Sequence, residues 1–264
     1  PGHRHFENFS QFMDTMRSDL LTISATVVPE YPGPRKPGVR LLHADPDAPV
    51  RVAAALLYPY GSASLSDLEA ALGRMPEEEL GRVLEAAASA RENRRHKSPR
   101  GLEMADYTFE IIGDFGAYRD LQRHRILSQE RQLLGCQYGY TVPPEIVGLP
   151  MEADYCRAIE QAQHAWEVMV RDFPEEAQYV VPMAFHIRWT FHANLRAFQW
   201  LCELRSQPQG HPNYREIAQE LAKAVIHVHP LFERFFRFVD WKQHELGRFA
   251  QEKRRVAKAE SGVS

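Results

Sequence analysis

The clearest regular pattern of apolar and polar positions lies in residues 180–193, where large apolar side chains alternate with polar ones. Alternation with a period of two is typical of a β-strand with one buried face, so we predict a strand here. Shorter runs of the same kind begin at Val39 and Tyr107 and predict two more strands. His186 and His192 fall on the polar side of the predicted strand, too far apart to chelate one metal ion, and we interpret them as part of a polar sheet face.

Apolar residues at helical spacing fill much of the remaining chain. Residues 6–21 predict one amphipathic helix that packs against a neighbour, and the prolines between 29 and 37 then predict a linker or extended arm. Start signals for further helices are Asp45 followed by Pro46, a capping box at residues 66–69, Pro76, and Asn194 as an N-cap. Besides the short helix that the capping box opens, the predicted helices cover residues 46–58, 76–90, 117–125, 152–171, 194–205, 214–228 and 230–247.

Length and composition describe one globular domain with extensions. The chain has 264 residues, of which 44% are hydrophobic, and a net charge of −3, which argues against bulk attraction to nucleic acid or to a membrane surface. Three cysteines without paired or metal-binding spacing predict a reducing, cytoplasmic setting. No apolar run approaches the roughly 18 residues that span a bilayer. The chain begins at Pro1 without a methionine, so we expect a processed or cloned piece of something longer.

A compact group of basic residues follows the second predicted strand. Arg123, His124 and Arg125 lie at the end of the helix predicted over residues 117–125, with Ser128 and Arg131 shortly after. Charge-assisted hydrogen bonds to phosphate contribute roughly 1.5–3 kcal/mol each, so this segment is a candidate anion site. The alternative is a solvated basic helix end, which the helix dipole favours anyway.

Two further sets of cations have less specific interpretations. Residues 91–100 form the densest positive run, which predicts a solvated or substrate-facing loop; without interleaved aromatic residues, a contact with nucleic acid is the weaker alternative. Arg196 and Arg205 lie about 2.5 turns apart on one predicted helix, so we expect them on different faces. They either point to two ligands, or one of them is a surface residue.

Common catalytic motifs are absent from the chain. It contains no Walker loop, no Gly-x-Gly-x-x-Gly after a strand, no Gly-x-Ser-x-Gly and no His-Glu-x-x-His. From the residues alone, the prediction is therefore a globular protein of helices and strands with a local anion site.

Several ordered strings between residues 39 and 247 resemble the flavin-dependent thymidylate synthases. Residues 39–46 resemble the opening of the family, and residues 96–103 resemble its His-x-Ser…Glu segment. The family signature is Arg-His-Arg, seven residues, then Ser; residues 123–128 match its first half, and the helix from Asn194 matches its Asn-x-Arg…Leu-Arg string. The resemblance implies an α+β fold with a mixed or antiparallel sheet flanked by helices. It places the family domain at 39–247, after an N-terminal helix and arm at 1–38 and before a basic tail at 248–264.

The resemblance also implies a flavin site. The FAD-binding residues it suggests are Arg123, His124, Arg125 and Ser128, with Asn194 and Arg196 reaching FAD bound mainly by another subunit. It assigns Arg205 to the dUMP phosphate. Family enzymes are homotetramers in which methylenetetrahydrofolate supplies the carbon and NADPH reduces the flavin.

Departures from the family pattern concentrate on the pyrimidine side. Leu133 replaces the serine of the family signature, and Gly135 replaces the arginine that follows it. Where the family has an Asn-Glu pair, this chain has Glu130 and Arg131. Elsewhere, Met104 replaces a histidine, Gln178 an arginine, and Trp200 a polar residue one turn after Arg196. Two hypotheses follow. The chain is a divergent flavoenzyme acting on a nucleotide-like substrate, with dUMP and rearranged ligands such as Arg131 as one version, or it is a non-catalytic FAD- or nucleotide-binding module of a tandem protein.

Overall fold

The computed structural model of the protein describes residues 2–27 and 36–243, with main-chain positions only for residues 2–5. The chain divides into two compact units, Pro1–Arg35 and Lys36–Ser264. Within the first unit, the described part is one helix, α1 (Gly2–Val27), which confirms a helix over the predicted residues 6–21; its packing against a neighbour stays a prediction. Most of the predicted arm and all of the basic tail lie outside the described residues.

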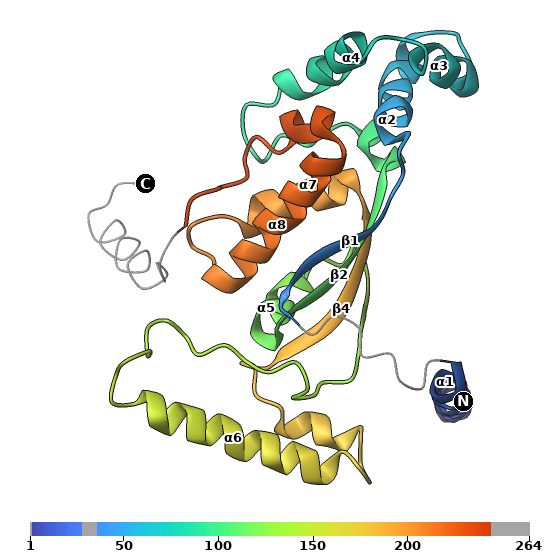
Figure 1. Cartoon of the computed structure of the whole chain (residues 1–264). Helices are drawn as coiled ribbons and strands as arrows, with labels where there is room; N and C mark the ends of the chain where they lie inside the picture. Colours follow the sequence, from blue (N-terminus) through green and yellow to red (C-terminus); the bar gives the residue numbers. More distant parts are fainter. Residues whose placement is uncertain (1, 28–35, 244–264) are drawn as a thin grey trace. The chain divides into compact units, whose positions relative to one another are not determined.

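A four-stranded antiparallel sheet organises the second unit, in the order β1-β2-β4-β3. The strands are β1 (Gly38–Ala44), β2 (Asp106–Asp114), β3 (Ser128–Arg131) and β4 (His186–Asn194). The three long strands twist together through the middle of the unit (Figure 1). This arrangement confirms the predicted α+β class, the antiparallel form of the sheet and the existence of three predicted strands, although the third begins at His186 rather than near residue 180; β3 had no prediction.

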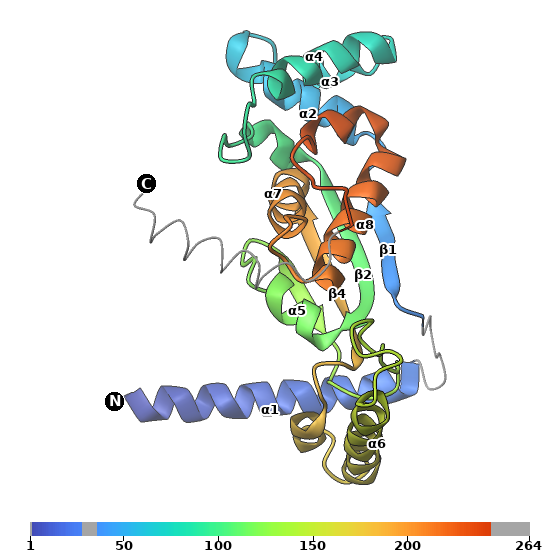
Figure 2. The same ribbon diagram turned by 90° about the vertical axis from the view of Figure 1, so that its left-hand side faces the viewer.

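One face of the sheet carries the core. Helices α5 (Phe115–Leu121), α7 (Leu195–Arg205) and α8 (Pro212–Val228) pack against this face, as Figures 1 and 2 show from two sides. The inward side chains of β4 are those of the predicted apolar positions, and Trp189 and Phe191 are almost completely buried. Residues on the other face, such as Thr190 and His192, are more accessible, as expected for a sheet covered on one side.

Further elements extend beyond both ends of the sheet. At one end lie α2 (Ala48–Leu57), α3 (Leu65–Leu72) and α4 (Glu77–Ser89), and at the other end lies α6 (Glu152–Met169), as seen in Figure 1. Short 3-10 turns connect these elements: Tyr58–Tyr60, Arg100–Met104, Glu176–Val180 and Pro230–Phe235.

Two predicted helix starts were wrong by a few residues. Asp45 does not cap a helix beginning at Pro46, because its carboxylate accepts the backbone N–H of Asp47 in a turn, and α2 begins only at Ala48. The cap of α3 is Ser64 rather than Ser66, since the Ser64 hydroxyl accepts the N–H of Asp67. The Asp45 bond forms a turn that competes with the helix for the same backbone groups, whereas the Ser64 bond starts α3 two residues earlier than predicted.

Two predicted helix ends were also wrong. The helix predicted over residues 117–125 ends at Leu121, so the Arg-His-Arg segment (residues 123–125) lies in the turn that follows α5. The last predicted helix, over residues 230–247, is a 3-10 turn at Pro230–Phe235 followed by irregular chain up to the last described residue. Its aromatic residues Phe232, Phe235 and Phe236 are nevertheless buried, so hydrophobicity predicted the burial but not the conformation.

Candidate functional site

A cavity of about 740 Å³ lies where β4 runs into α7, and we call it the cationic cavity. Six predicted site residues line it together: Arg123, His124, Arg125, Asn194, Arg196 and Arg205. They come from the turn after α5 and from the start and end of α7, and the loop at residues 91–98 completes the wall. A cavity of this volume is in the range that holds a cofactor-sized ligand.

The sign of its charge distinguishes this cavity from the rest of the molecule. Eight lysine and arginine side chains line it against one described carboxylate, that of Glu103, although the whole chain carries a net charge of −3. The cations are Arg91, Arg94, Arg95, Lys97, Arg123, Arg125, Arg196 and Arg205. A concave surface of one charge sign concentrates ligands of the opposite sign, so this donor set fits a phosphorylated ligand.

Asn194 holds the junction between β4 and α7. Its side-chain oxygen accepts the backbone N–H of Ala197 at 2.9 Å, which confirms the predicted N-cap. One residue into the helix, the Arg196 guanidinium donates to the Ser98 carbonyl at 2.9 Å and to the Glu103 carboxylate at 2.7 Å. This cap and these two bonds fix the mouth of the cavity between strand, helix and loop.

Arg196 and Arg205 line the same cavity, so neither is the simple surface residue that one alternative predicted; that they point to two ligands stays a prediction. Arg196 belongs to the first turn of α7 and Arg205 to its last. Their positions do lie on different sides of the helix, but an arginine side chain is long enough to bring its head group round to a shared cavity.

His124 acts as a hydrogen-bond acceptor for Arg205. The Arg205 Nε–H donates to the His124 Nε2 at 2.9 Å. Burial, with the positive charge of Arg205 as a second cause, lowers the pKa of His124 to about 4. The imidazole is therefore neutral at physiological pH, and it orients the partly buried Arg205 side chain rather than adding a charge of its own.

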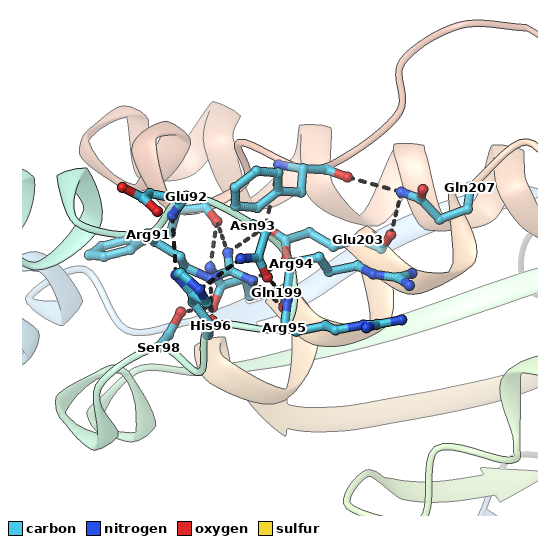
Figure 3. Close-up of polar contacts among 12 residues, drawn as sticks. Arg91, Glu92, Asn93, Arg94, Arg95, His96, Ser98, Gln199, Glu203 and Gln207 are labelled. Carbon is cyan, nitrogen blue, oxygen red and sulfur yellow. Dashed lines mark hydrogen bonds and ion pairs between the residues drawn. The ribbon is translucent and has the colours of Figure 1, made fainter. Parts of the chain in front are cut away.

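A buried ion pair anchors the basic loop, which we define as residues 91–97 (Figure 3). Both Arg91 Nη atoms donate to the Glu203 carboxylate, at 2.6 and 2.5 Å, and the two side chains are only 7% and 0% exposed. Arg91 Nε also donates to the His96 carbonyl at 2.7 Å, and Nη2 to the Arg94 carbonyl at 3.1 Å. Burial raises the pKa of Glu203, and the bidentate contact with Arg91 opposes that shift.

Gln199 extends this anchor along α7. Its amide oxygen accepts the Ser98 hydroxyl at 2.5 Å, and its amide nitrogen donates to the Phe235 carbonyl at 2.5 Å (Figure 3). Sequence reasoning missed both Gln199 and Glu203. The signal was available, because these two polar residues, four positions apart, share a helix face with the apolar Leu195 and Cys202.

Two predicted site residues lie outside the cationic cavity, on β3. Ser128 is exposed and pairs in register with His192 of β4. Arg131 donates to the Gln132 carbonyl and to the Gln178 side-chain oxygen, both at 3.0 Å. The same oxygen of Gln178 accepts the N–H of Leu134, also at 3.0 Å, so Gln178 fixes the loop that follows β3.

The loop after β3 leaves no room for a side chain at residue 135. A Cβ atom added to Gly135 would lie 2.9 Å from the Trp166 ring and closer still to the Gln137 side chain. Glycine at this position is therefore part of a tight contact, and an arginine could be accommodated only if the Gln137 and Trp166 side chains moved.

Other predicted features have simple structural outcomes. His186 is buried, with Nε2 3.0 Å from the Thr141 hydroxyl and Nδ1 3.2 Å from the Tyr138 carbonyl, so it is not a surface residue of the sheet. In the part of the chain that the structure describes, no three His, Cys, Asp or Glu side chains gather in a way that would hold a metal ion. Over the same residues, every helix is too short or too polar to cross a membrane.

Comparison with known proteins gives one family and several relatives. Residues 40–231 match the family described as thymidylate synthase complementing protein. A UPF0159 protein of Chlamydia muridarum is 49% identical over 97% of this chain and 49% of its own length, and one of Chlamydia pneumoniae is 55% identical over 83% and 41%. A UPF0159 protein of Thermoplasma acidophilum is 34% identical over 89% and 48%. The chain thus spans about half the length of the curated relatives it matches.

Proposed function

Because the chain belongs to the family of thymidylate synthase complementing proteins, the flavin-dependent thymidylate synthases, we propose that it binds FAD in the cationic cavity. The reaction we propose is the reductive methylation of dUMP to dTMP, with methylenetetrahydrofolate and NADPH as co-substrates. One observation carries the proposal. Six of the residues that the family resemblance assigns to ligand binding line one cavity, whose lining includes eight cations. FAD, when bound, supplies the hydride transfer.

In this proposal, the chain's own residues bind and orient. Arg123 and Arg125 donate to the flavin phosphates. The Arg123 side chain is largely exposed, and its Nε lies 3.9 Å from the Asp120 carboxylate, a weak surface pair that a ligand phosphate can replace. Asn194 and Arg196 form the adjoining wall, fixed by the helix cap and by the bonds to Ser98 and Glu103. Arg205, oriented by His124, binds the phosphate of the nucleotide substrate. Ser128 and Arg131 lie outside the cavity and would contribute only after β3 or its side chains move.

We also take the oligomeric state and the cellular compartment from the family. We propose a homotetramer with active sites between subunits, working in the cytoplasm on a nucleotide-like small molecule, with no role for nucleic acid. Sedimentation of the purified protein tests the assembly directly: a strictly monomeric protein that binds FAD would contradict it.

A second candidate function is a non-catalytic FAD- or nucleotide-binding module within a longer protein. The observation that favours it is the loop after β3, where Leu133 and Gly135 replace the polar residues of the family signature and Gly135 is closely packed. In this version, the cavity binds its ligand but the pyrimidine side has no groups to position a base.

One experiment separates these functions. The purified protein is reconstituted with FAD, and bound flavin is measured by its visible absorbance; stoichiometric flavin is expected under the main proposal, and a protein unable to take up added FAD would refute it. The flavin is then reduced anaerobically and mixed with dUMP and methylenetetrahydrofolate. Oxidation of the flavin with formation of dTMP supports a synthase, whereas bound flavin without any turnover supports the non-catalytic module.

A further inference from the structure

Trp200 gives the cationic cavity an aromatic wall. Its indole, on α7, is 41% exposed, and it is the only Phe, Tyr or Trp among the described residues that line the cavity. Leu195, Phe198 and Leu201 of α7 are buried in the core, whereas Leu204 is half-buried and also lines the cavity. An exposed tryptophan inside a cavity dominated by cations needs a reason other than core packing.

Arg94 lies over this tryptophan. Its guanidinium carbon is 5.7 Å from the centroid of the Trp200 ring, within the range of a cation–π contact. The backbone of Arg94 is held in place, since its carbonyl accepts the N–H of the buried Arg91 side chain. The anchor of the basic loop therefore also positions Arg94 beside the indole.

The Arg94 guanidinium has an unused donor. Its Nη1 atom is shielded from solvent and has no hydrogen-bond partner among residues 2–27 and 36–243. Glu203 lies near enough to feel the charge of Arg94, but its carboxylate oxygens already accept from Arg91. A shielded N–H without a partner is unfavourable, and an acceptor oxygen on a bound ligand would remove that cost.

We propose that Arg94 and Trp200 form a specificity-determining subsite for the planar heteroaromatic ring of the ligand. The indole stacks on the ring, and the Arg94 guanidinium turns away from the indole so that its Nη1 donates to an oxygen of the same ligand. This assignment rests on the proposed function, because it takes the phosphates to lie on the Arg123, Arg125 and Arg205 side of the cavity. It adds what that function leaves open, namely which residues recognise the ring.

The chemistry of the subsite defines a class of ligand. Stacking of a base on an aromatic side chain tolerates different bases, because every base has a π-face. Flavin, uracil and nicotinamide rings all combine such a face with a carbonyl oxygen, so FAD, dUMP and NADPH are the three sources to distinguish. An unsubstituted phosphate or pyrophosphate would engage the cations without using Trp200.

The test compares matched variants of Trp200 in the full chain. Affinities for FAD, dUMP and NADPH are measured by titration calorimetry for the wild type, Trp200→Phe and Trp200→Leu. Phenylalanine keeps a π-face and leucine keeps only apolar bulk, so we expect near-normal affinity for the first and a loss of roughly 5- to 150-fold for the second. The ligand whose affinity falls identifies whose ring occupies the subsite.

Two controls make the result specific. Trp241→Leu removes a tryptophan of similar exposure, 44%, that lies outside the cationic cavity, and its affinities should equal those of the wild type. Arg94→Met should lower the affinity for the same ligand as Trp200→Leu does, roughly tenfold, because one hydrogen bond to that ligand is lost.

The subsite and the proposed function fail in different ways. If wild-type protein binds FAD normally and Trp200→Leu binds all three ligands as tightly as Trp200→Phe does, the subsite is refuted while the flavin proposal stands. If FAD does not bind but dUMP or NADPH does, with a loss in Trp200→Leu, the flavin proposal is refuted and the subsite stands. Absence of binding by all three ligands overturns both.

Discussion

The two ends of the sheet contain the same structural unit with opposite chemistry. At one end β2 runs into α5, and the Asp114 carboxylate accepts the N–H of Ala117 at 2.7 Å. At the other end β4 runs into α7, and the Asn194 oxygen accepts the N–H of Ala197 at 2.9 Å. Because β2 and β4 are antiparallel, these two strand–cap–helix junctions lie at opposite ends of the sheet. In both junctions the last residue of the strand caps the helix through the N–H three residues later.

The two junctions differ in the charge of the cavities beside them. A cavity of about 480 Å³ beside Asp114, which we call the acidic cavity, is lined also by Glu216 and Glu220, and no lysine or arginine is among its described lining residues. The cationic cavity beside Asn194 has eight. The cations come mostly from the basic loop and the turn after α5, outside the strands. The sheet thus provides two equivalent positions, and the loops determine which of them attracts an anion.

The largest expected effect comes from removing the cations of the Arg-His-Arg segment. The double variant Arg123→Ala, Arg125→Ala loses two charge-assisted contacts worth roughly 1.5–3 kcal/mol each, so the affinity for FAD should fall by roughly a hundredfold or more. Flavin retained through gel filtration measures this loss. Unchanged retention would show that the anion site lies elsewhere.

Arg119→Ala is the matched control for that experiment. Arg119 lies on α5, a few residues before the segment, but its side chain reaches Met183, which lines the acidic cavity. It carries the same charge as Arg123, so a purely long-range electrostatic effect would lower binding in both variants. We expect flavin binding to be unaffected by Arg119→Ala.

Breaking the ion pair that anchors the basic loop should lower the free energy of unfolding more than any of the other variants does. Glu203→Gln leaves the Arg91 guanidinium buried without its counter-charge, and removing one partner of a buried pair typically costs about 3–5 kcal/mol. Urea denaturation measures the free energy of unfolding. Glu216→Gln at the acidic cavity is the comparison; its side chain is exposed, and a change within about 0.5 kcal/mol is expected.

A small effect of Glu203→Gln would contradict the role assigned to the ion pair. In that case, Arg91 must find other acceptors, and the backbone carbonyls of His96 and Arg94 already lie within reach. The double variant Arg91→Met, Glu203→Leu then becomes informative. If the pair holds the loop, this apolar replacement should regain stability but still weaken ligand binding, because the basic loop loses its anchor.

Periodicity predicted the fold better than it predicted the cationic cavity. The alternation around Trp189 and the cap at Asn194 follow from local chemistry, and the structure confirms both. The anchor does not follow in the same way, because Arg91 and Glu203 are far apart in sequence and meet only through packing. Arg91 was predicted within a solvated or substrate-facing loop, and nothing local distinguishes it from Arg94 or Arg95.

The predicted residues of the site depended on the family resemblance rather than on local pattern. A basic triplet after a helix fits a solvated charge cluster equally well, and only its neighbours in space change that interpretation. His124 illustrates the limit: counted from sequence as one more donor, it accepts a hydrogen bond from Arg205 and is neutral because it is buried. Burial and partner geometry, which decide this, are properties of the tertiary structure.

Removing either helix cap should have a moderate effect on stability. Asp114→Ala and Asn194→Ala each remove one side-chain acceptor at a helix start, which typically costs about 1 kcal/mol. Chemical denaturation should show similar losses for the two variants. Flavin titration should separate them, since only Asn194 lines the cationic cavity. Equal effects on binding would mean that the junctions are coupled through the sheet rather than chemically distinct.

The smallest effect concerns the pH dependence of stability. His124 is neutral in the folded protein, where its pKa is about 4, whereas in the unfolded chain it takes up a proton near 6.5. Between these values the unfolded state binds more protons, so the free energy of unfolding should fall as the pH is lowered from 6.5 towards 4. Because the side chain is partly exposed, we expect a contribution on the order of 1 kcal/mol or less.

His124→Gln isolates this contribution, because the glutamine amide oxygen can still accept from Arg205 but does not titrate in this range. Denaturation curves at several pH values should show a shallower acid dependence for the variant than for the wild type. Some dependence should persist, since burial also lowers the pKa of His229. A bound phosphate beside Arg205 would favour protonation of His124, so a saturating anion should also flatten the wild-type profile. Identical profiles with and without the anion would place its binding site away from His124, and the contrast between the two ends of the sheet would then lose its functional meaning.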